Sequence, residues 1–427
     1  MSNILEVVLT RLCYTIFVLF TLHSSASSEI LGLACGYEGR DFEICRDSAE
    51  QWAARTGNIV LTYPVPDDRA ERLDLFDKVL SEDAPKFDVI ELEASWASAL
   101  SEHLLTLETY LPYAIPGQSP VMLRNLTVDG ELKGLPFHGA PPGIYYRTDL
   151  LEKYGLDVPL TWDALQTAAA TIQAGERAEG NNAFWGYVFQ GDMGLSLSAN
   201  AAEWLISHRG VGIAGDDGRI TLDHPDYIEA LERAAGWIGT ISPPEVLNYD
   251  EEDVRAVFQQ GNAAFMRNLP YVYPLLNSPI SPVSGNVGAE FMPSANNHPP
   301  VAMMDGWALV IAKRTSNPDV AASLVRHLAS IGEQRRRALE ASFFPSQIIL
   351  FSDREVRSYF PIVEDYEEVE GNIRMRPRQY IGRGYAEATV AFQSAVQSVL
   401  RGERDAASTL KTLEKEITEI LNKAAKQ

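Results

Sequence analysis

Residues 145–165 read YYRTDLLEKYGLDVPLTWDAL, and residues 172–177 read IQAGER. The pattern predicts an extended strand over residues 144–146 and a short helix from Asp149 to Tyr154 that a glycine ends. Thr161 is the expected N-cap of a second, longer helix. A strand followed by helices in this way belongs to an α/β domain. On this pattern alone, an unrelated α/β lobe with well-capped helices is the favoured interpretation.

Length and charge narrow the class of protein. The chain has 427 residues, more than one average hydrophobic core organises, so we expect two domains. Its formal net charge is −22. That charge disfavours binding to nucleic-acid phosphates or to anionic membrane surfaces, both of which require clustered Lys and Arg. We therefore expect no nucleic-acid partner.

The N-terminus has the features of an export signal. Arg11 precedes an apolar run over residues 12–22, which is shorter than the roughly 20 apolar residues of a membrane span. Small residues follow at positions 24–28. Together they predict a signal peptide over residues 1–28, cleaved near Ser27 or Ser28, and a periplasmic location. An uncleaved anchor is the alternative.

The cysteines fit an oxidising compartment. Of the three, Cys13 would leave with the signal, and Cys35 and Cys45 would remain as a disulfide. A loop this short stabilises the fold by about 2–3 kcal/mol on the chain-entropy model. Two buried free thiols are the alternative. A lipoprotein cleavage box before Cys35 is disfavoured, because lipidation would leave Cys45 without a partner.

Strands and helices alternate along the chain. The first part predicts a βαβαβ unit, and hence a mainly parallel sheet with helices on both faces. Residues 134–137 read as a crossover between two lobes, and the strand from Trp307 to Ala312 as a return to the first lobe. The other expected elements are strands over residues 30–35, 59–63, 87–92 and 263–266 and helices over residues 42–56, 70–80, 96–104, 200–207, 227–238, 250–259, 317–330 (capped by Asn317), 385–400 and 406–423.

Several longer motifs match one family, over residues 68–73, 88–92, 184–191, 200–204 and 258–268, together with the opening stretch. They resemble the family 1 extracellular solute-binding proteins of ABC sugar importers, particularly the trehalose/maltose and α-glucoside branch. The resemblance implies an α/β, two-lobed periplasmic-binding-protein fold. Each lobe would be a central mainly parallel sheet flanked by helices, with the ligand cleft between the lobes. Residues 29–138 plus about 305–350 would form lobe 1, and residues 139–304 plus about 351–427 lobe 2.

The function implied is that of a periplasmic substrate-binding protein that closes like a hinge around a carbohydrate or glycoside and delivers it to the ABC permease. The resemblance implies a monomer without cofactor, metal or catalytic activity. An exported glycosidase is the alternative enzyme; its paired carboxylates would be Glu91 and Glu93, which share one face of a strand but flank a scissile bond poorly. A protein that presents its ligand to a sensor kinase is a further alternative.

A sugar site needs flat aromatic rings against the C–H faces and carboxylates, amides or Arg against the hydroxyls. The resemblance and the loop positions select the following ligand-binding candidates: Glu38, Arg40, Asp41, Glu93, Trp96, His138, Tyr145, Tyr271, Asp305, Gly306, Trp307 and Arg376. Simpler interpretations remain open for several of them. Trp307 also fits a core position, Asp41 the start of a helix, Glu93 a helix cap, and Arg376 a basic surface.

Two departures from the family pattern bear on the ligand. Ala140 stands where relatives have a sugar-binding Asp, and Leu269 stands where they have a stacking Trp. Loss of a carboxylate that accepts hydroxyl hydrogen bonds costs about 1.5–3 kcal/mol for the usual ligand. We therefore expect that plain trehalose and maltose bind weakly and that a different glycoside binds well.

Overall fold

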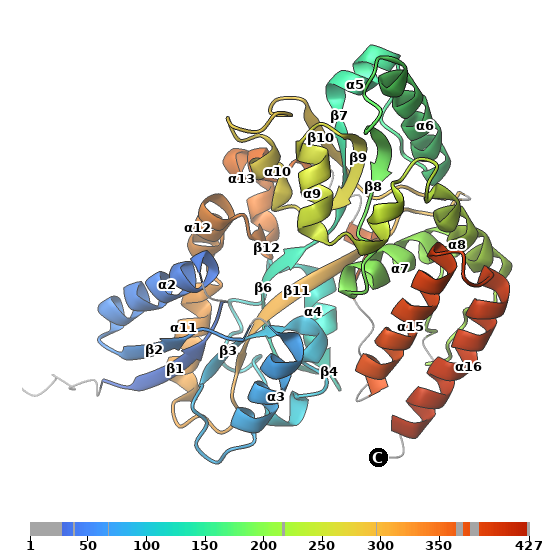
Figure 1. Cartoon of the computed structure of the whole chain (residues 1–427). Helices are drawn as coiled ribbons and strands as arrows, with labels where there is room; N and C mark the ends of the chain where they lie inside the picture. Colours follow the sequence, from blue (N-terminus) through green and yellow to red (C-terminus); the bar gives the residue numbers. More distant parts are fainter. Residues whose placement is uncertain are drawn as a thin grey trace, which may run out of the picture.

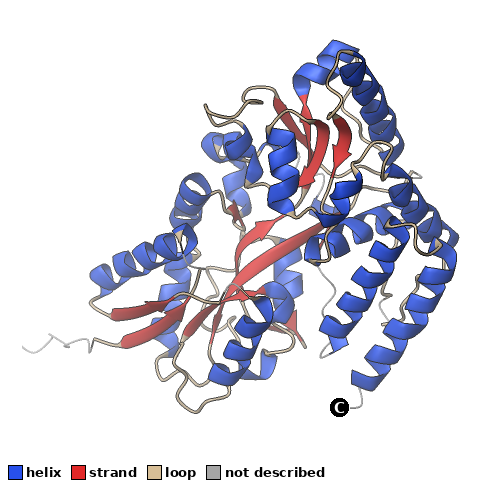
Figure 2. Cartoon of the chain, viewed as in Figure 1, coloured by secondary structure: helices blue, strands red, loops and turns tan. Residues whose placement is uncertain are grey.

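The computed structural model describes residues 28–36, 39–66, 68–215, 218–295, 297–363, 370–375 and 384–424. Two lobes are visible, each built around its own sheet and covered by helices (Figures 1 and 2). We call the half with the larger sheet lobe 1 and the other half lobe 2. Nearly all of the predicted signal, residues 1–28, lies outside the described residues. Within them, no helix combines the length and the apolarity needed to cross a bilayer.

The sheet of lobe 1 contains β1 (Ile30–Ala34), β2 (Ile59–Tyr63), β3 (Val89–Glu93), β6 (Leu135–Ala140), β11 (Ala302–Ile311), β12 (Phe344–Pro345) and β13 (Ile373–Met375). Their order is β12-β6-β11-β3-β1-β2, with β13 beside β11. β1 runs parallel to β2 and to β3, as predicted. β11 runs antiparallel to β3 and β6, because the chain enters this sheet from the other lobe. The parallel order predicted from the βαβαβ pattern is therefore confined to one side of a mixed sheet.

The helices of lobe 1 are α2 (Arg40–Thr56), α3 (Arg69–Leu80), α4 (Pro120–Leu126), α11 (Pro318–Leu328) and α12 (Ile331–Ala341), and a short hairpin joins β4 (Thr127–Val128) to β5 (Glu131–Leu132). The helix predicted over residues 96–104 is wrong: 3₁₀ turns occupy η1 (Ala94–Trp96) and η2 (Ser101–His103). The chain straightens there because Leu104 bridges to Ala312 beyond the end of β11. Asn317 precedes α11 as predicted, but its side chain makes no capping hydrogen bond.

Lobe 2 has a smaller sheet, in the order β10-β7-β9-β8, made of β7 (Gly143–Arg147), β8 (Trp185–Val188), β9 (Ala263–Asn268) and β10 (Val287–Glu290). β8 runs parallel to β9, whereas β7 runs antiparallel to β9 and to β10. This sheet is thus mixed as well. The stretch that opened the sequence analysis folds as predicted, since Thr161 accepts a hydrogen bond from the N–H of Ala164 at 3.1 Å and caps the longer helix.

The helices of lobe 2 are α5 (Thr148–Tyr154), α6 (Trp162–Ala178), α7 (Leu195–Arg209), α8 (Pro225–Trp237), α9 (Glu251–Gln259), α10 (Val272–Leu276), α13 (Arg354–Tyr359), α15 (Tyr385–Leu400) and α16 (Ala406–Ala424). α15 and α16 lie side by side and pack on α8 (Figure 1). Trp162, Trp204 and Trp237 are buried together with Tyr187 and Phe189 in the core of this lobe. Trp204 is therefore a core residue of lobe 2.

The long strand β11 connects the lobes. Its first residues lie against α7 of lobe 2, where the N–H of Met303 donates to Glu203 at 3.0 Å. Its later residues pair with β3 and β6 in the middle of the lobe 1 sheet. Figure 2 shows this strand running diagonally from one lobe toward the other. Asp305, Gly306 and Trp307 lie between these two ends, so β11 places them where the lobes meet.

Candidate functional site

A hollow lies between the lobes beside the middle of β11. Its wall is formed by Glu93, Ser95, Asn125, Leu195, Met304, Asp305, Gly306, Trp307 and Met375. Most of these residues come from lobe 1, while Leu195 is the first residue of α7 in lobe 2. The volume is about 70 Å³, well below the ~300–1,000 Å³ of ordinary ligand pockets. A ligand of that size therefore enters while the lobes are further apart than in this structure.

Trp307 lies in this wall and is partly exposed. In the sheet it stands opposite Glu93 of β3 on one side and His138 of β6 on the other. Directly opposite residues on antiparallel strands share one face of the sheet. The indole and the imidazole of His138 are stacked, with ring centroids 4.7 Å apart and planes at 15°. One flat face of Trp307 is thus covered by protein.

His138 and Glu91 form a buried pair behind Trp307. The imidazole Nε2 lies 2.8 Å from one oxygen of Glu91, and the other oxygen accepts the N–H of Gly36 at 3.0 Å. Burial lowers the pKa of His138, against the opposing effect of Glu91. Burial raises the pKa of Glu91, but the hydrogen bond from His138 and the positive charge of Arg337 outweigh it and lower the pKa overall. A neutral imidazole that donates to an ionised carboxylate follows.

Glu93 carries the carboxylate at the rim of the hollow. Both of its oxygens accept hydrogen bonds from arginines of α3, from Arg69 at 2.7 Å and from Arg72 at 2.8 Å. The same guanidinium groups cover the ring of Trp96, at 5.1 and 5.4 Å from its centroid. Trp96 is 4% exposed and belongs to the lobe 1 core. The structure therefore gives Trp96 a supporting place beneath Glu93 rather than the ligand contact that we expected.

Asn125 was not selected from the sequence. It lies on α4, and its side-chain oxygen is buried without a hydrogen-bond partner in the described structure, although the residue lines the hollow. A buried acceptor without a partner costs about 1–3 kcal/mol. Ser95, on the neighbouring turn after β3, adds a hydroxyl to the same wall. The hollow thus combines a flat ring with one unmet acceptor, the side-chain oxygen of Asn125.

Gly306 lies next to Trp307, and we expected it to leave room for a close approach of ligand. A side-chain carbon at this position would lie 3.0 Å from the terminal methyl carbons of Met122 and Met375. Methionines of the protein thus occupy the space that the missing side chain leaves. Asp305, the preceding residue, lies opposite Ala140 in the β11–β6 register and lines the hollow.

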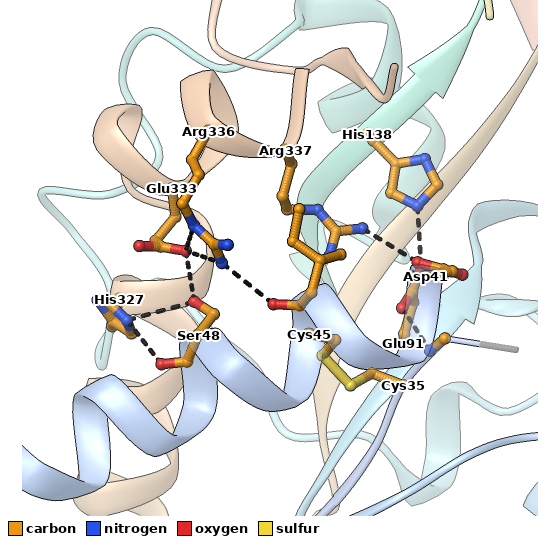
Figure 3. The surroundings of a disulfide bond; sticks show 12 residues. Cys35, Asp41, Cys45, Ser48, Glu91, His138, His327, Glu333, Arg336 and Arg337 are labelled. Carbon is orange, nitrogen blue, oxygen red and sulfur yellow. Dashed lines mark hydrogen bonds and ion pairs between the residues drawn. A yellow bond between two sulfur atoms is a disulfide. The ribbon is translucent and has the colours of Figure 1, made fainter. Parts of the chain in front are cut away.

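Asp41 and Arg40 begin α2 but do not line the hollow. Arg40 is exposed and pairs with Glu340 of α12 at 3.3 Å. Asp41 pairs at 3.7 Å with Arg337, whose guanidinium carbon lies 4.0 Å above the ring of Phe137 and 4.2 Å above that of Phe343. Figure 3 shows Arg337 pointing toward Asp41 beside the Glu91–His138 pair. The start of α2 thus joins a buried polar cluster behind the site.

The predicted disulfide between Cys35 and Cys45 is present, with a Cα–Cα distance of 6.5 Å. It joins the residue after β1 to α2 close to the same cluster (Figure 3). Gly36 follows at once in the left-handed region, with φ of 67°, and a side chain there would collide with the backbone of Phe42. The disulfide therefore fixes the position from which the N–H of Gly36 donates to Glu91.

The two tyrosines predicted for the site lie elsewhere in lobe 2. Tyr145 is 1% exposed, because its position on β7 points into the core, and burial raises its pKa. Tyr271 donates to Glu252 of α9 at 2.6 Å and packs against the same core cluster. The expectation for Tyr145 is corrected accordingly, and Tyr271 does not line the hollow. Glu38 and Arg376 fall outside the described residues, so their predicted roles rest on the sequence alone.

Of the residues predicted from the sequence, Glu93, Asp305, Gly306 and Trp307 come together at the hollow. Those that sequence reasoning missed are Ser95, Asn125, Leu195, Met304 and Met375. Ser95 lies between Glu93 and Trp96, so the motif that selected those two residues could also have selected Ser95. The other four residues show no local sequence pattern that indicates a site. In the described part of the chain, no group of three His, Cys, Asp or Glu side chains is placed to hold a metal ion.

Comparison with known proteins finds related sequences and structures. The family described as bacterial extracellular solute-binding protein matches residues 58–335. A probable ABC transporter-binding protein of Deinococcus radiodurans is 38% identical over 405 residues, which span 94% of this chain and 96% of the relative. The structure of maltose-bound MalE3 of T. maritima matches with a TM-score of 0.80 and 29% identity over 92% of this chain and 100% of that one.

A second solved structure shares the fold at lower identity. It is an ABC transporter solute-binding protein of Thermotoga lettingae bound to alpha-D-tagatose, with a TM-score of 0.76 and 21% identity over 92% of this chain and 100% of that chain. The two-lobed α/β architecture is thus the one that this chain shares with these solved structures.

Proposed function

The chain belongs to the bacterial extracellular solute-binding proteins and is the binding component of an ABC transporter, and from that premise we propose that it captures a carbohydrate or polyol in the hollow between its lobes. A binding component works with the permease of its transporter. We infer that this chain acts as a monomer in the periplasm, after removal of residues 1–28, and delivers its ligand there without chemical change.

The composition of the hollow supports a hydroxyl-rich ligand. Trp307 offers a flat ring against which the C–H face of a sugar can stack. The unpartnered oxygen of Asn125 requires a donor, and a ligand hydroxyl is such a donor. The carboxylate of Glu93 is fixed by Arg69 and Arg72, so it accepts hydrogen bonds without any loss of side-chain freedom. The buried acceptor of Asn125 is the observation on which the proposal chiefly rests.

The partners of Glu91 and Glu93 argue against glycoside hydrolysis. Glycosidases place an acid and a second carboxylate on either side of the bond that they cleave. Glu91 is 6% exposed and bonded to His138 and Gly36, while Glu93 is paired with arginines of α3. Incubation with aryl α- and β-glucosides tests this, and release of the aryl group would support the enzyme instead.

A ligand screen tests the proposal. Monosaccharides, polyols, disaccharides and glycosides are added singly, and the unfolding temperature is followed by differential scanning fluorimetry. A ligand at 100 times its Kd adds about 2.7 kcal/mol to the stability. Asn125→Leu should lose the shift for the best ligand, because the variant cannot accept a hydroxyl hydrogen bond. Asn181→Leu, outside the hollow, is the matched control. A panel without any stabilising compound would refute the carbohydrate assignment.

Hinge closure follows from the way the chain passes between the sheets. We place lobe 1 at residues 29–138 plus about 305–350, with β13 added to its sheet, and lobe 2 at the remainder of residues 139–304 plus about 351–427. β6 and β7 lie in different sheets and are separated by Pro141 and Pro142, where a bend of the backbone changes the angle between lobes. Small-angle scattering with and without ligand measures it: the radius of gyration should fall on binding, and an unchanged value would argue against closure.

A further inference from the structure

One face of the Trp307 ring is covered inside lobe 1. His138 lies directly opposite on β6, and the two rings stack with centroids 4.7 Å apart at 15°. The indole lines the hollow with the remainder of its surface. The ring face turned away from His138 is therefore the one that Trp307 offers to a ligand, and its position and tilt depend on the imidazole behind it.

His138 is held in turn from several sides. The ring of Phe343 packs on it at 4.6 Å between centroids, and Glu91 holds its Nε2 at 2.8 Å. The second oxygen of Glu91 is fixed by the N–H of Gly36, next to the disulfide at Cys35. The imidazole cannot rotate away from the indole without breaking a buried hydrogen bond, which is costly. A continuous set of contacts thus runs from the disulfide to the wall of the hollow.

We propose that His138 is a positioning residue for ligand binding: held by Glu91, it fixes the plane of the Trp307 ring on which the ligand stacks. His138 is 6% exposed and acts through Trp307 rather than by touching the ligand. A ring that is already fixed loses less freedom on binding, so affinity is gained. The inference rests on the proposed carbohydrate function, because it concerns the same hollow.

The test distinguishes an effect of His138 on the position of the Trp307 ring from an effect on the stability of the whole protein. The protein is labelled with 5-fluorotryptophan, and Trp307→Phe identifies the Trp307 resonance among those of the seven tryptophans. His138→Gln keeps an N–H that can reach Glu91 but removes the ring. We expect the Trp307 fluorine resonance to move before ligand is added. The Kd of the best ligand from the screen should rise about twofold to tenfold, the value of an aromatic pair.

Matched variants complete the experiment. His327 of α11 also lies in lobe 1 and contacts Ser48 of α2, so His327→Gln should leave the resonance and the Kd unchanged. The double variant Glu91→Gln/His138→Phe restores a flat ring without an unpaired buried carboxylate but lacks the hydrogen bond that holds the ring, so it should recover the resonance and the Kd only in part. If His138→Gln lowers the unfolding temperature but leaves the Trp307 resonance and the Kd as in the wild type, the proposal is overturned. Should the wild type bind no carbohydrate, the proposed function fails and the resonance alone decides the role of His138.

Discussion

Glu203 and Arg267 form a bidentate ion pair inside lobe 2, with nitrogen–oxygen distances of 2.8 and 3.2 Å. Glu203 is fully buried and Arg267 is 1% exposed. The same carboxylate accepts the N–H of Met303, at the beginning of β11. The pair therefore anchors, within lobe 2, the strand that carries Trp307 into lobe 1.

Removal of one partner should destabilise the protein severely. Arg267→Met leaves the Glu203 carboxylate buried without its cation, and we expect a loss of about 3–5 kcal/mol in urea unfolding. Glu203→Leu/Arg267→Met removes both charges and should lose less than the single variant. Equal losses in the single and double variants would show that packing, rather than charge, sets the cost.

The disulfide should form in the exported protein and contribute to its stability. Alkylation without reductant, followed by intact-mass measurement, should leave Cys35 and Cys45 unmodified. Cys35→Ser/Cys45→Ser should lower the free energy of unfolding by about 2–3 kcal/mol, as expected for a short closed loop. Two alkylated thiols in the untreated protein would contradict the prediction.

Trp307→Ala should weaken ligand binding while the protein remains folded. Loss of a packed aromatic at the centre of a site costs about 1–3 kcal/mol, which isothermal titration calorimetry measures directly. Trp185→Ala is the control, because Trp185 stacks on Arg177 in lobe 2 and lies outside the hollow. Unchanged affinity in Trp307→Ala would assign the indole to the core.

Acidification should destabilise the protein through the Glu91–His138 pair. Burial lowers the pKa of His138, so the unfolded chain takes up a proton near pH 6.5 and the folded protein only at lower pH. The pKa of Glu91 is also lowered overall, which extends the loss below about pH 4.5 as this carboxylate is protonated. Each titrating group changes the free energy of unfolding by at most about 1.4 kcal/mol per pH unit.

Urea unfolding of the wild type and His138→Gln between about pH 7 and pH 5 measures this effect. Burial also lowers the pKa of His208 and His327, so the variant should reduce the acid dependence without abolishing it. A wild-type stability that rises on acidification through this range would contradict the assignment of a neutral, buried His138.

Plain trehalose and maltose should bind weakly, and another glycoside should bind well. Ala140 lies opposite Asp305 beside the hollow and supplies no acceptor for a sugar hydroxyl. Leu269, just after β9, supplies no flat face. A site whose polar groups stay unpaired discriminates strongly against the wrong ligand. Sub-micromolar affinity for either disaccharide would show that other residues compensate for both substitutions.

Much of the lobe architecture could be predicted because the period of apolar residues and the helix caps are local signals. The Thr161 cap and the parallel strands β1, β2 and β3 are examples. The antiparallel entry of β11 could not be predicted, since it depends on how the chain returns from lobe 2. The helix predicted over residues 96–104 was wrong for a similar reason, because pairing with residues far along the chain overrode the helical pattern.

The site was predicted in part. Glu93, Asp305 and Trp307 were found because they follow motifs, and β3 and β11 bring these residues side by side. Tyr145 was a weaker candidate, and the alternation of β7 turns its side chain into the core. Asn125 belongs to a short helix without a motif, and Leu195 precedes the motif at residues 200–204 of α7, so only the tertiary fold brings them to the hollow.

The place of β11 also determines the order in which the protein can fold. Lobe 2 strands β7 to β10 lie in one uninterrupted stretch of chain, whereas β3 and β6 must wait for β11, which is made much later. Closing such a long loop is slow, and the unpaired edges of β3 and β6 are open to aggregation meanwhile. A chain crossing the membrane from its N-terminus thus exposes its first lobe incomplete until most of its length has emerged, and holding chaperones should act during that interval.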